Sequence, residues 1–253
     1  MHMTEPMHRR QRLDQALVDR GLAPTRSQAR DLVKRGCVEV DGAPAAKTAQ
    51  LVGAAAGIEV ADGAQPWVSR GGLKLAAALA AFGFDARDAI ALDIGASTGG
   101  FTHVLLEAGA RRVYAVDVGR DQLHPRVAAD SRVVRLEGQD ARLLDRAIVP
   151  EPPGAIVADV SFISLTQALP AALALAAPGA WLSALIKPQF EVGRAEIGKG
   201  GIVRDEAARA CAVAKVRTWL EVEAGWLVVG IIPSPISGGS GNQELLIGAR
   251  RHD

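Results

Sequence analysis

The sequence predicts an α/β protein: a Rossmann-like domain with a mostly parallel, seven-stranded sheet, preceded by a small α+β domain. Short apolar runs alternate with segments of helical spacing from residue 90 onward. The first of these runs leads directly into a glycine-rich loop, residues 95–100, and five successive runs end in or near a charged residue. The length of 253 residues allows one large domain and one small one.

The small domain is expected at residues 11–60, after a polar tail at residues 1–10 and before a linker at residues 61–68. Apolar residues at helical spacing predict two helices, which end at Gly21 and Gly36. Their apolar faces are Leu13, Ala16 and Leu17 in the first helix, and Ala29, Leu32 and Val33 in the second.

Capping and turn residues complete the prediction for this domain. Thr25 and Gln28 form a candidate capping box for the second helix. Cys37–Val40 has the composition of a strand and runs into the turn Asp41-Gly42. A second strand near Gly57–Val60 is expected to pair with it.

The larger domain is expected at residues 69–253, and Ser69 is a candidate cap for a helix that runs to Ala81. Strands are predicted at Ile90–Ile94, Arg112–Val116, Arg132–Leu136, Ala155–Val160, Trp181–Lys187, Gly225–Ile232 and Gln243–Ala249. Further helices are predicted near Thr102–Gly109, Gln122–Ala129, Leu165–Ala176 and Asp205–Val222. Because Pro233–Asn242 contains no helix, the last two strands should form an antiparallel pair at one edge of the sheet.

The segment Leu92–Thr102 is typical of a nucleotide-binding corner, in which a strand ends in an acidic residue before a glycine-rich loop. Ser97 stands where the second glycine of G-x-G-x-x-G belongs, and no G-K-[ST] follows, so neither a dinucleotide fingerprint nor a phosphate loop is present. The pattern suits a ligand with an amino-acid end and a ribose but no phosphate, such as S-adenosylmethionine. An ordinary tight turn is the alternative.

Charged residues stand at the ends of five successive predicted strands: Asp93, Asp117, Asp140, Asp159 and Lys187. In an open parallel sheet, ligands bind outside these ends. Asp117 lies 22 residues after Gly95, the usual separation for a carboxylate that binds ribose hydroxyls. Asp140 is placed to accept a hydrogen bond from the exocyclic amine of an adenine. Solvated loop charges are the alternative interpretation.

Two further charged residues are expected at the same edge of the sheet. Glu244 opens the last, antiparallel strand, and Lys74 lies on the helix before the first strand. A partly desolvated site favours balanced charges. The sequence therefore predicts a group of two cations and two carboxylates: Lys74, Asp159, Lys187 and Glu244.

Composition restricts the remaining function classes. The formal net charge is +1, so nucleic-acid binding depends on local charge, and residues 1–50 hold nine Lys/Arg against six Asp/Glu. Arg26, Arg30 and Lys34 recur every four residues on one helix face, where they could contact phosphates or simply be solvated. No metal or disulfide spacing, signal peptide or membrane-spanning run is recognisable, and a cytoplasmic, monomeric protein is expected.

The larger domain resembles the FtsJ-like RNA ribose methyltransferases, which have a Lys-Asp-Lys-Glu tetrad in this chain order. From about residue 10 to residue 250, the chain resembles the TlyA family, which joins an RNA-binding domain of the ribosomal-protein S4 type to such a methyltransferase. The stretches on which the resemblance rests include Arg12–Asp14, Ser27–Arg30, Ser69–Leu75, Asp93–Thr102, Asp159–Leu165, Lys187–Glu191, Lys199–Asp205, Ser234–Ile236 and Gly241–Glu244. The chain departs from the family at Gln65, where a basic residue is expected two positions before Trp67.

The resemblance implies transfer of a methyl group from S-adenosylmethionine to a ribose 2′-hydroxyl of ribosomal RNA, in a cytidine of the large or the small subunit. Lys187 would orient or deprotonate that hydroxyl, together with Lys74, Asp159 and Glu244. The implied cofactor-binding residues are Asp93, Gly95, Ser97, Gly99, Gly100, Phe101, Asp117, Asp140 and Asp159, and the implied RNA-binding residues are Arg12, Arg26, Arg30, Lys34 and Arg35. No metal is implied. Two alternatives are a haemolysin, a name that the family also has, and a non-catalytic RNA-binding factor in ribosome assembly.

Overall fold

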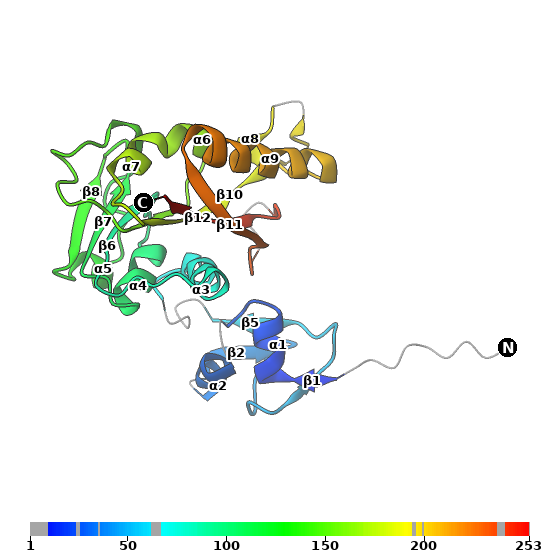
Figure 1. Cartoon of the computed structure of the whole chain (residues 1–253). Coiled ribbons are helices and arrows are strands. Elements are labelled where there is room, and N and C mark those ends of the chain that lie inside the picture. Colours follow the sequence, from blue (N-terminus) through cyan, green and yellow to red (C-terminus); the bar gives the residue numbers. More distant parts are fainter. Residues whose placement is uncertain are drawn as a thin grey trace. The chain divides into compact units, whose positions relative to one another are not determined.

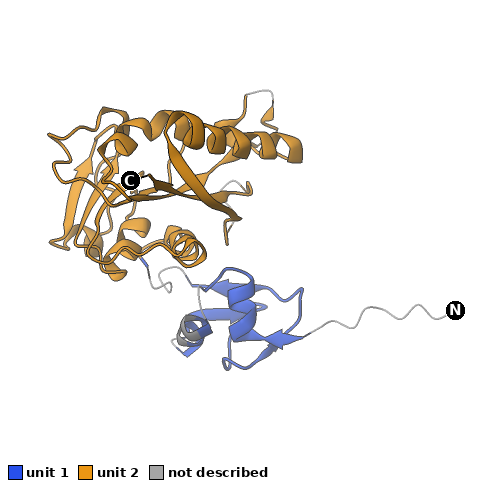
Figure 2. Cartoon of the chain, viewed as in Figure 1, with its two compact units in different colours: residues 1–67 blue, residues 68–253 orange. Residues whose placement is uncertain are grey.

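The computed structural model describes residues 10–23, 26–34, 36–61, 67–193, 196–198, 200–236 and 241–252. The chain divides into two compact units, residues 1–67 and residues 68–253 (Figure 2). Thr25 of the candidate capping box, Arg35 of the expected RNA-binding residues and Gln65 of the linker lie outside the described residues.

The first unit packs two helices, α1 and α2, over short strands. Its elements are β1 (Gln11–Arg12), α1 (Leu13–Asp19), α2 (Arg26–Lys34), β2 (Val38–Val40), β3 (Ala43–Pro44), β4 (Leu51–Val52) and β5 (Ile58–Val60). β2 pairs antiparallel with β5, so the expected pairing of these two segments is confirmed. The two-residue strands β1, β3 and β4 were not predicted, because two residues are too few for an alternating pattern.

The second unit contains a seven-stranded sheet that confirms the predicted fold class. Its order is β11 (Trp226–Pro233), β12 (Leu245–Arg251), β10 (Trp181–Ile186), β9 (Ala155–Ala158), β6 (Ile90–Ile94), β7 (Arg112–Asp117) and β8 (Val133–Glu137). β12 is antiparallel to both neighbours, whereas β10, β9, β6, β7 and β8 are mutually parallel. The predicted antiparallel pair is confirmed, with β11 at the edge. Every residue of β6, β9 and β10 is buried, as expected for strands covered on both faces.

Helices cover both faces of this sheet (Figure 1). On one face lie α3 (Gly71–Phe82), α4 (Gly100–Glu107) and α5 (Pro125–Ala128), and on the other lie α6 (Leu165–Ala168), α7 (Pro170–Leu175) and α9 (Glu206–Thr218), which continues into η3 (Trp219–Glu223). The single helix predicted over Leu165–Ala176 is wrong: Pro170 lacks an N–H and begins a second helix there. The cap predicted at Ser69 is also wrong, because Arg70 occupies the N-cap of α3 without a capping side-chain bond.

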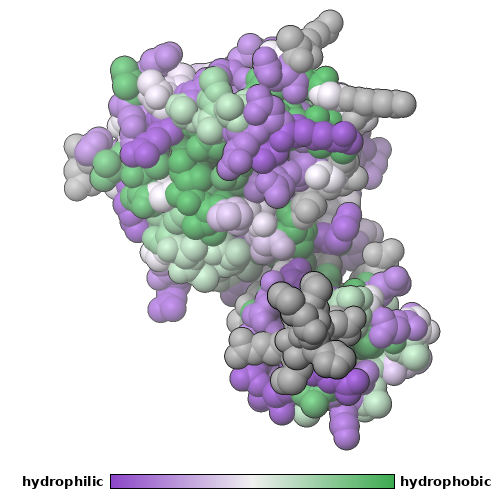
Figure 3. Space-filling model, turned by 90° about the vertical axis from the view of Figure 1, so that its right-hand side faces the viewer, coloured by the Kyte–Doolittle hydropathy of each residue, from purple (hydrophilic) through white to green (hydrophobic). Residues whose placement is uncertain are grey.

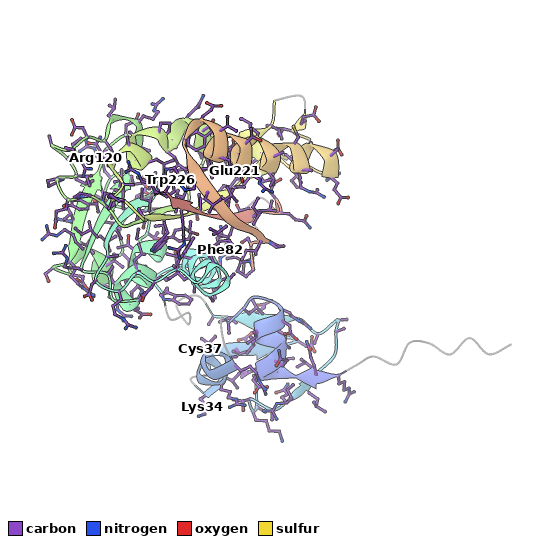
Figure 4. All side chains as sticks on the ribbon, viewed as in Figure 1. Lys34, Cys37, Phe82, Arg120, Glu221 and Trp226 are labelled. Atoms are coloured by element: carbon purple, nitrogen blue, oxygen red, sulfur yellow. The ribbon has the colours of Figure 1, made fainter. Side chains whose placement is uncertain are left out.

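Glycines in β12 and β11 make room for a side chain of α3. The Phe82 side chain at the end of α3 lies against Gly248 and Gly230 (Figure 4). A Cβ atom at Gly248 would lie 2.6 Å from the Phe82 ring, so a larger residue there would force the Phe82 side chain to move.

The edge strand β11 exposes apolar side chains, among them Leu227 and Val229. Apolar residues also gather on the face of the larger unit that Figure 3 shows. A register shift between Val228 and Gly230 interrupts the pairing of β11 with β12, and such a bulge discourages the edge from pairing with another chain. Across the described part of the chain, no helix is long and apolar enough to cross a membrane.

Candidate active site

A cavity of about 370 Å³ opens at the carboxyl ends of β6, β7 and β9. The sequence-predicted residues that line it are Gly95, Ser97, Asp117, Asp140 and Asp159. The parallel strands place these residues at one edge, as expected for a ligand site in an open sheet.

The glycine-rich loop brings backbone close to this cavity. Gly95 has a φ of +82°, and a Cβ atom there would lie 2.6 Å from the backbone oxygen of Asp159. The Ser97 N–H donates to Oδ2 of Asp117 at 2.8 Å, and the Gly119 N–H donates to Oδ1 at 2.8 Å. Two backbone donors therefore fix the Asp117 carboxylate at the cavity, which suits a partner for ribose hydroxyls.

Asp140 lines the same cavity but already has a cationic partner. Arg142 donates to both carboxylate oxygens of Asp140, with an Nη2–Oδ2 distance of 2.6 Å, and its N–H donates to Oδ1 at 2.9 Å. These side-chain hydrogen bonds lower the pKa of Asp140. The carboxylate is therefore held at the cavity by Arg142, which the sequence reasoning missed.

Asp93 and Gly99 are not among the described residues that line this cavity or a second one beside it, so their role in cofactor binding stays a prediction. Asp93 is fully buried and accepts a 2.6 Å hydrogen bond from the Thr102 hydroxyl of α4, while its Oδ1 has no hydrogen-bond partner among the described residues. Burial raises the pKa of Asp93 to about 7. Asp93 thus supports the loop from within the fold.

Asp93→Asn is expected to change how the free energy of unfolding depends on pH. Folding raises the pKa of Asp93 from its ordinary 3.8 to about 7, so the folded protein binds this proton more tightly than the unfolded chain does. The contribution of this proton to the free energy of unfolding is fully present below pH 3.8 and is lost as the pH rises through about 7. The variant lacks this loss, so its stability relative to the wild type should rise by about 2–4 kcal/mol between pH 4 and pH 8. Urea unfolding at a series of pH values measures the difference, and a constant difference would contradict it.

A second cavity, of about 320 Å³, adjoins the first. The two share Gly95, Ser97, Asp159 and Ser161. Further residues that line the second cavity include Arg70, Lys74, Gly100, Phe101 and Lys187. A ligand in the first cavity can therefore meet a second molecule at Asp159.

The four charged residues predicted to act together are in contact there. Nζ of Lys74 lies 2.7 Å from Oε2 of Glu244 and 3.7 Å from Oδ2 of Asp159. Nζ of Lys187 lies 2.7 Å from Oδ1 of Asp159. All four side chains are at most 20% exposed, so two cations and two carboxylates balance in a partly desolvated group.

Ser161 is a member of this site that sequence reasoning did not single out. Nζ of Lys187 donates to Oγ of Ser161 at 2.9 Å. Lys187 therefore has two fixed partners, Asp159 and Ser161, both from the loop that follows β9. The signal was available, because Ser161 lies two residues after Asp159 at a strand end.

A third cavity, of about 380 Å³, shares Ser161, Lys187 and Glu244 with the rest of the site. Phe162 and Phe190 line it, with ring centroids 5.2 Å apart. Phe162 has a φ of +67° and is 91% exposed, an unusual conformation for an aromatic residue. An exposed Phe162 ring against a half-buried Phe190 ring, beside charged groups, suits a planar ligand such as a nucleobase.

In the first unit, three of the expected basic residues surround a buried carboxylate that the sequence reasoning missed. Asp14 is fully buried and ion-paired with Arg12 at 3.0 Å, Arg26 at 3.1 Å and Arg30 at 3.0 Å. The hydrogen bonds from Arg12 and its neighbours hold the pKa of Asp14 well below its usual range. The three arginine side chains remain 44–48% exposed, and Lys34 is exposed on the same helix as Arg26 and Arg30 (Figure 4).

Both units match family models. The FtsJ-like methyltransferase model matches residues 67–251, and the S4 domain model matches residues 11–56.

Relatives match almost the entire chain. A Mycobacterium tuberculosis protein named 16S/23S rRNA (cytidine-2′-O)-methyltransferase TlyA is 45% identical, over 96% of this chain and 91% of the relative. Hemolysin A of Brachyspira hyodysenteriae is 40% identical, over 93% of this chain and 98% of the relative. A solved structure from Streptococcus thermophilus that has the name hemolysin is 40% identical with a TM-score of 0.73, over 98% of this chain and 90% of that one. The chain therefore belongs to the TlyA family, in which an FtsJ-like methyltransferase domain follows an S4 domain.

Proposed function

We propose that the protein transfers a methyl group from S-adenosylmethionine to the 2′-hydroxyl of a cytidine in ribosomal RNA. The observation that most directly supports this is the contact of Lys74, Asp159, Lys187 and Glu244 where the cavities adjoin. The name of the Mycobacterium tuberculosis relative supports the same acceptor, in both ribosomal subunits.

The first cavity has the groups that the donor needs. S-adenosylmethionine, when bound, would supply a methyl group on a sulfonium, and the neutral thioether of S-adenosylhomocysteine would leave without help from a metal. The backbone at Gly95 and Ser97 would bind its methionine end, Asp117 its ribose and Asp140 its adenine amine. The tight backbone at Gly95 and the fixed Asp117 carboxylate fit these roles.

The four charged residues would orient the acceptor hydroxyl and take up its proton. Lys187 orients the 2′-hydroxyl or accepts its proton, while Asp159 holds Lys187 at 2.7 Å. Glu244 orients Lys74, which approaches the other oxygen of Asp159. Alignment of the attacking oxygen can by itself supply about 7–11 kcal/mol of the barrier, so the fixed positions of these groups are as important as their proton chemistry.

The first unit would bind RNA through the phosphate backbone. Arg12, Arg26, Arg30 and Lys34 present exposed cationic groups. Cations of this kind supply sequence-independent affinity that falls with salt. Arg35 belongs to the same proposal from its sequence position.

Asp14→Asn is expected to weaken RNA binding by about tenfold, although it makes the unit more positive. Without the carboxylate, Arg12, Arg26 and Arg30 lose the partner that holds their guanidinium groups in place. Filter binding to ribosomal RNA across a salt series measures both affinity and slope. Asp19→Asn, which removes an exposed negative charge from the same helix, is the control. Tighter binding by Asp14→Asn would contradict the expectation.

The function is tested by mass spectrometry of ribosomal RNA from cells with and without the gene. Loss of a cytidine 2′-O-methyl group from either subunit is expected, and the wild-type gene should restore it. Complementation with Lys187→Met separates catalysis from a role in assembly, since a non-catalytic factor would still restore ribosome assembly. Identical methylation with and without the gene would contradict the proposed function.

A further inference from the structure

Two segments that follow neighbouring strands supply most of the proposed acceptor site. The loop Asp159–Ser164 follows β9, and the segment Lys187–Glu191, which includes the short helix α8 (Pro188–Glu191), follows β10. At one end the segments are joined through Lys187, which contacts Asp159 and Ser161. The position of Lys187 relative to the loop therefore depends on how firmly the two segments are held together.

Glu191 joins the same two segments at their other end. Its Oε2 accepts a 2.5 Å hydrogen bond from the Ser164 hydroxyl, and its Oε1 accepts a 2.8 Å hydrogen bond from the Leu165 N–H. The Glu191 side chain is 1% exposed. Both carboxylate oxygens are thus used to fix the end of the loop at the start of α6.

A cation from α9 compensates this buried carboxylate. Nζ of Lys215 donates to the backbone oxygen of Glu191 at 3.0 Å and lies 3.4 Å from its Oε2. A buried carboxylate without such partners would be costly. The contacts of Glu191 therefore connect α8, α6 and α9.

The loop between the two attachments includes a strained residue. Phe162, with a φ of +67°, lies between Ser161, which contacts Lys187, and Ser164, which contacts Glu191. Such a conformation persists when the surrounding structure holds it in place. The attachments at Ser161 and Ser164 provide that restraint on both sides of Phe162.

From this geometry we propose that Glu191 is a positioning residue: it clamps the loop 159–164 to the segment 187–191 and so sets Lys187 against Asp159 and Ser161 for methyl transfer. The proposal rests on the proposed function for its kinetic consequence, and on the hydrogen bonds alone for its effect on the loop. Glu191 itself is not among the described residues that line the three cavities, so its effect passes through the loop and Lys187.

The test compares Glu191→Ala, Glu191→Gln and wild type in the full chain. Glu191→Ala is expected to lower kcat on ribosomal subunits by about 10- to 100-fold, with the KM for S-adenosylmethionine within about threefold of wild type. Glu191→Gln should restore most of kcat, because its amide can accept from the Leu165 N–H and donate to the Ser164 hydroxyl. Glu221→Ala, which removes an exposed partner of Arg217, is the matched control.

A second readout does not depend on activity. Hydrogen–deuterium exchange of peptides that cover residues 159–165 is expected to be at least about tenfold faster in Glu191→Ala than in Glu221→Ala. If Glu191→Ala does not fold, Ser164→Ala provides the same comparison with one hydrogen bond removed. A wild-type exchange rate in the loop overturns the clamp, as does wild-type kcat in Glu191→Ala or equal loss in Glu191→Gln. A wild-type protein without methyl transfer would contradict the proposed function alone, because loop exchange still tests the clamp.

Discussion

Methyl transfer by Lys187→Met is expected to fall by about 100- to 10,000-fold, the range that a positioned proton-transfer group contributes. Nζ of Lys187 is held 2.7 Å from Asp159 and 2.9 Å from Ser161, and Lys187 lines both cavities on the acceptor side. Methionine keeps the unbranched side chain as far as Cε but removes the amine. Turnover of tritiated methyl groups onto ribosomal RNA measures the loss, with the thermal midpoint as a check on folding.

Binding of S-adenosylmethionine should change little in this variant, because the first cavity is lined by other residues. Calorimetry with the cofactor alone is expected to give a Kd within about threefold of wild type. Lys187→Arg is the matched comparison: it keeps the charge, but a guanidinium does not release a proton. Turnover by Lys187→Arg above that of Lys187→Met measures the contribution of charge placement. Wild-type turnover by Lys187→Met would overturn the assignment of Lys187.

The group of four charged residues could be predicted from sequence mainly because the direction of each strand determines the edge of the sheet at which its end lies. Parallel strands place their carboxyl ends at one edge, so Asp159 and Lys187 had to be neighbours once β9 and β10 paired. Glu244 joins them because β12 runs antiparallel and begins at that edge. The sequence alone could not predict that Lys74 bonds to Glu244 at 2.7 Å, since helix rotation depends on packing.

Other features depend on contacts that have no local pattern. Asp93 has the position of a strand-end ligand residue, but the hydroxyl of Thr102 holds it inside the fold. The helical pattern predicts that Asp14 is a polar residue on the solvent side of an amphipathic helix, although it is fully buried beneath three arginines. Glu191 contacts Ser164, 27 residues earlier in the chain. The spacing of residues predicts the faces of a single helix or strand, whereas each of these contacts joins two different elements. Such contacts therefore leave no pattern in the local sequence.

Gly95→Ala is expected to abolish cofactor binding, with the Kd for S-adenosylmethionine raised by at least about 100-fold. An alanine Cβ at this position would lie 2.6 Å from the backbone oxygen of Asp159 and 3.0 Å from its carbonyl carbon. The contact is with backbone, so no side-chain rotation relieves it. The φ of +82° adds strain that glycine avoids. The loop and Asp159 would have to separate, and both line the cavity.

Gly83→Ala separates the effect of backbone strain from the effect of the close contact. Gly83 has a φ of +63° at the end of α3, but an added Cβ would have nothing within 4 Å. This control should cost about 1 kcal/mol of stability from backbone strain and leave cofactor binding at the wild-type level. Calorimetry for the Kd and urea unfolding for stability give the two quantities in parallel. If Gly95→Ala bound the cofactor as well as Gly83→Ala does, the close approach of Gly95 to the Asp159 backbone would have no part in forming the site. If the Kd is raised in Gly95→Ala alone, the contact with Asp159 is the cause, since both variants have the same kind of backbone strain.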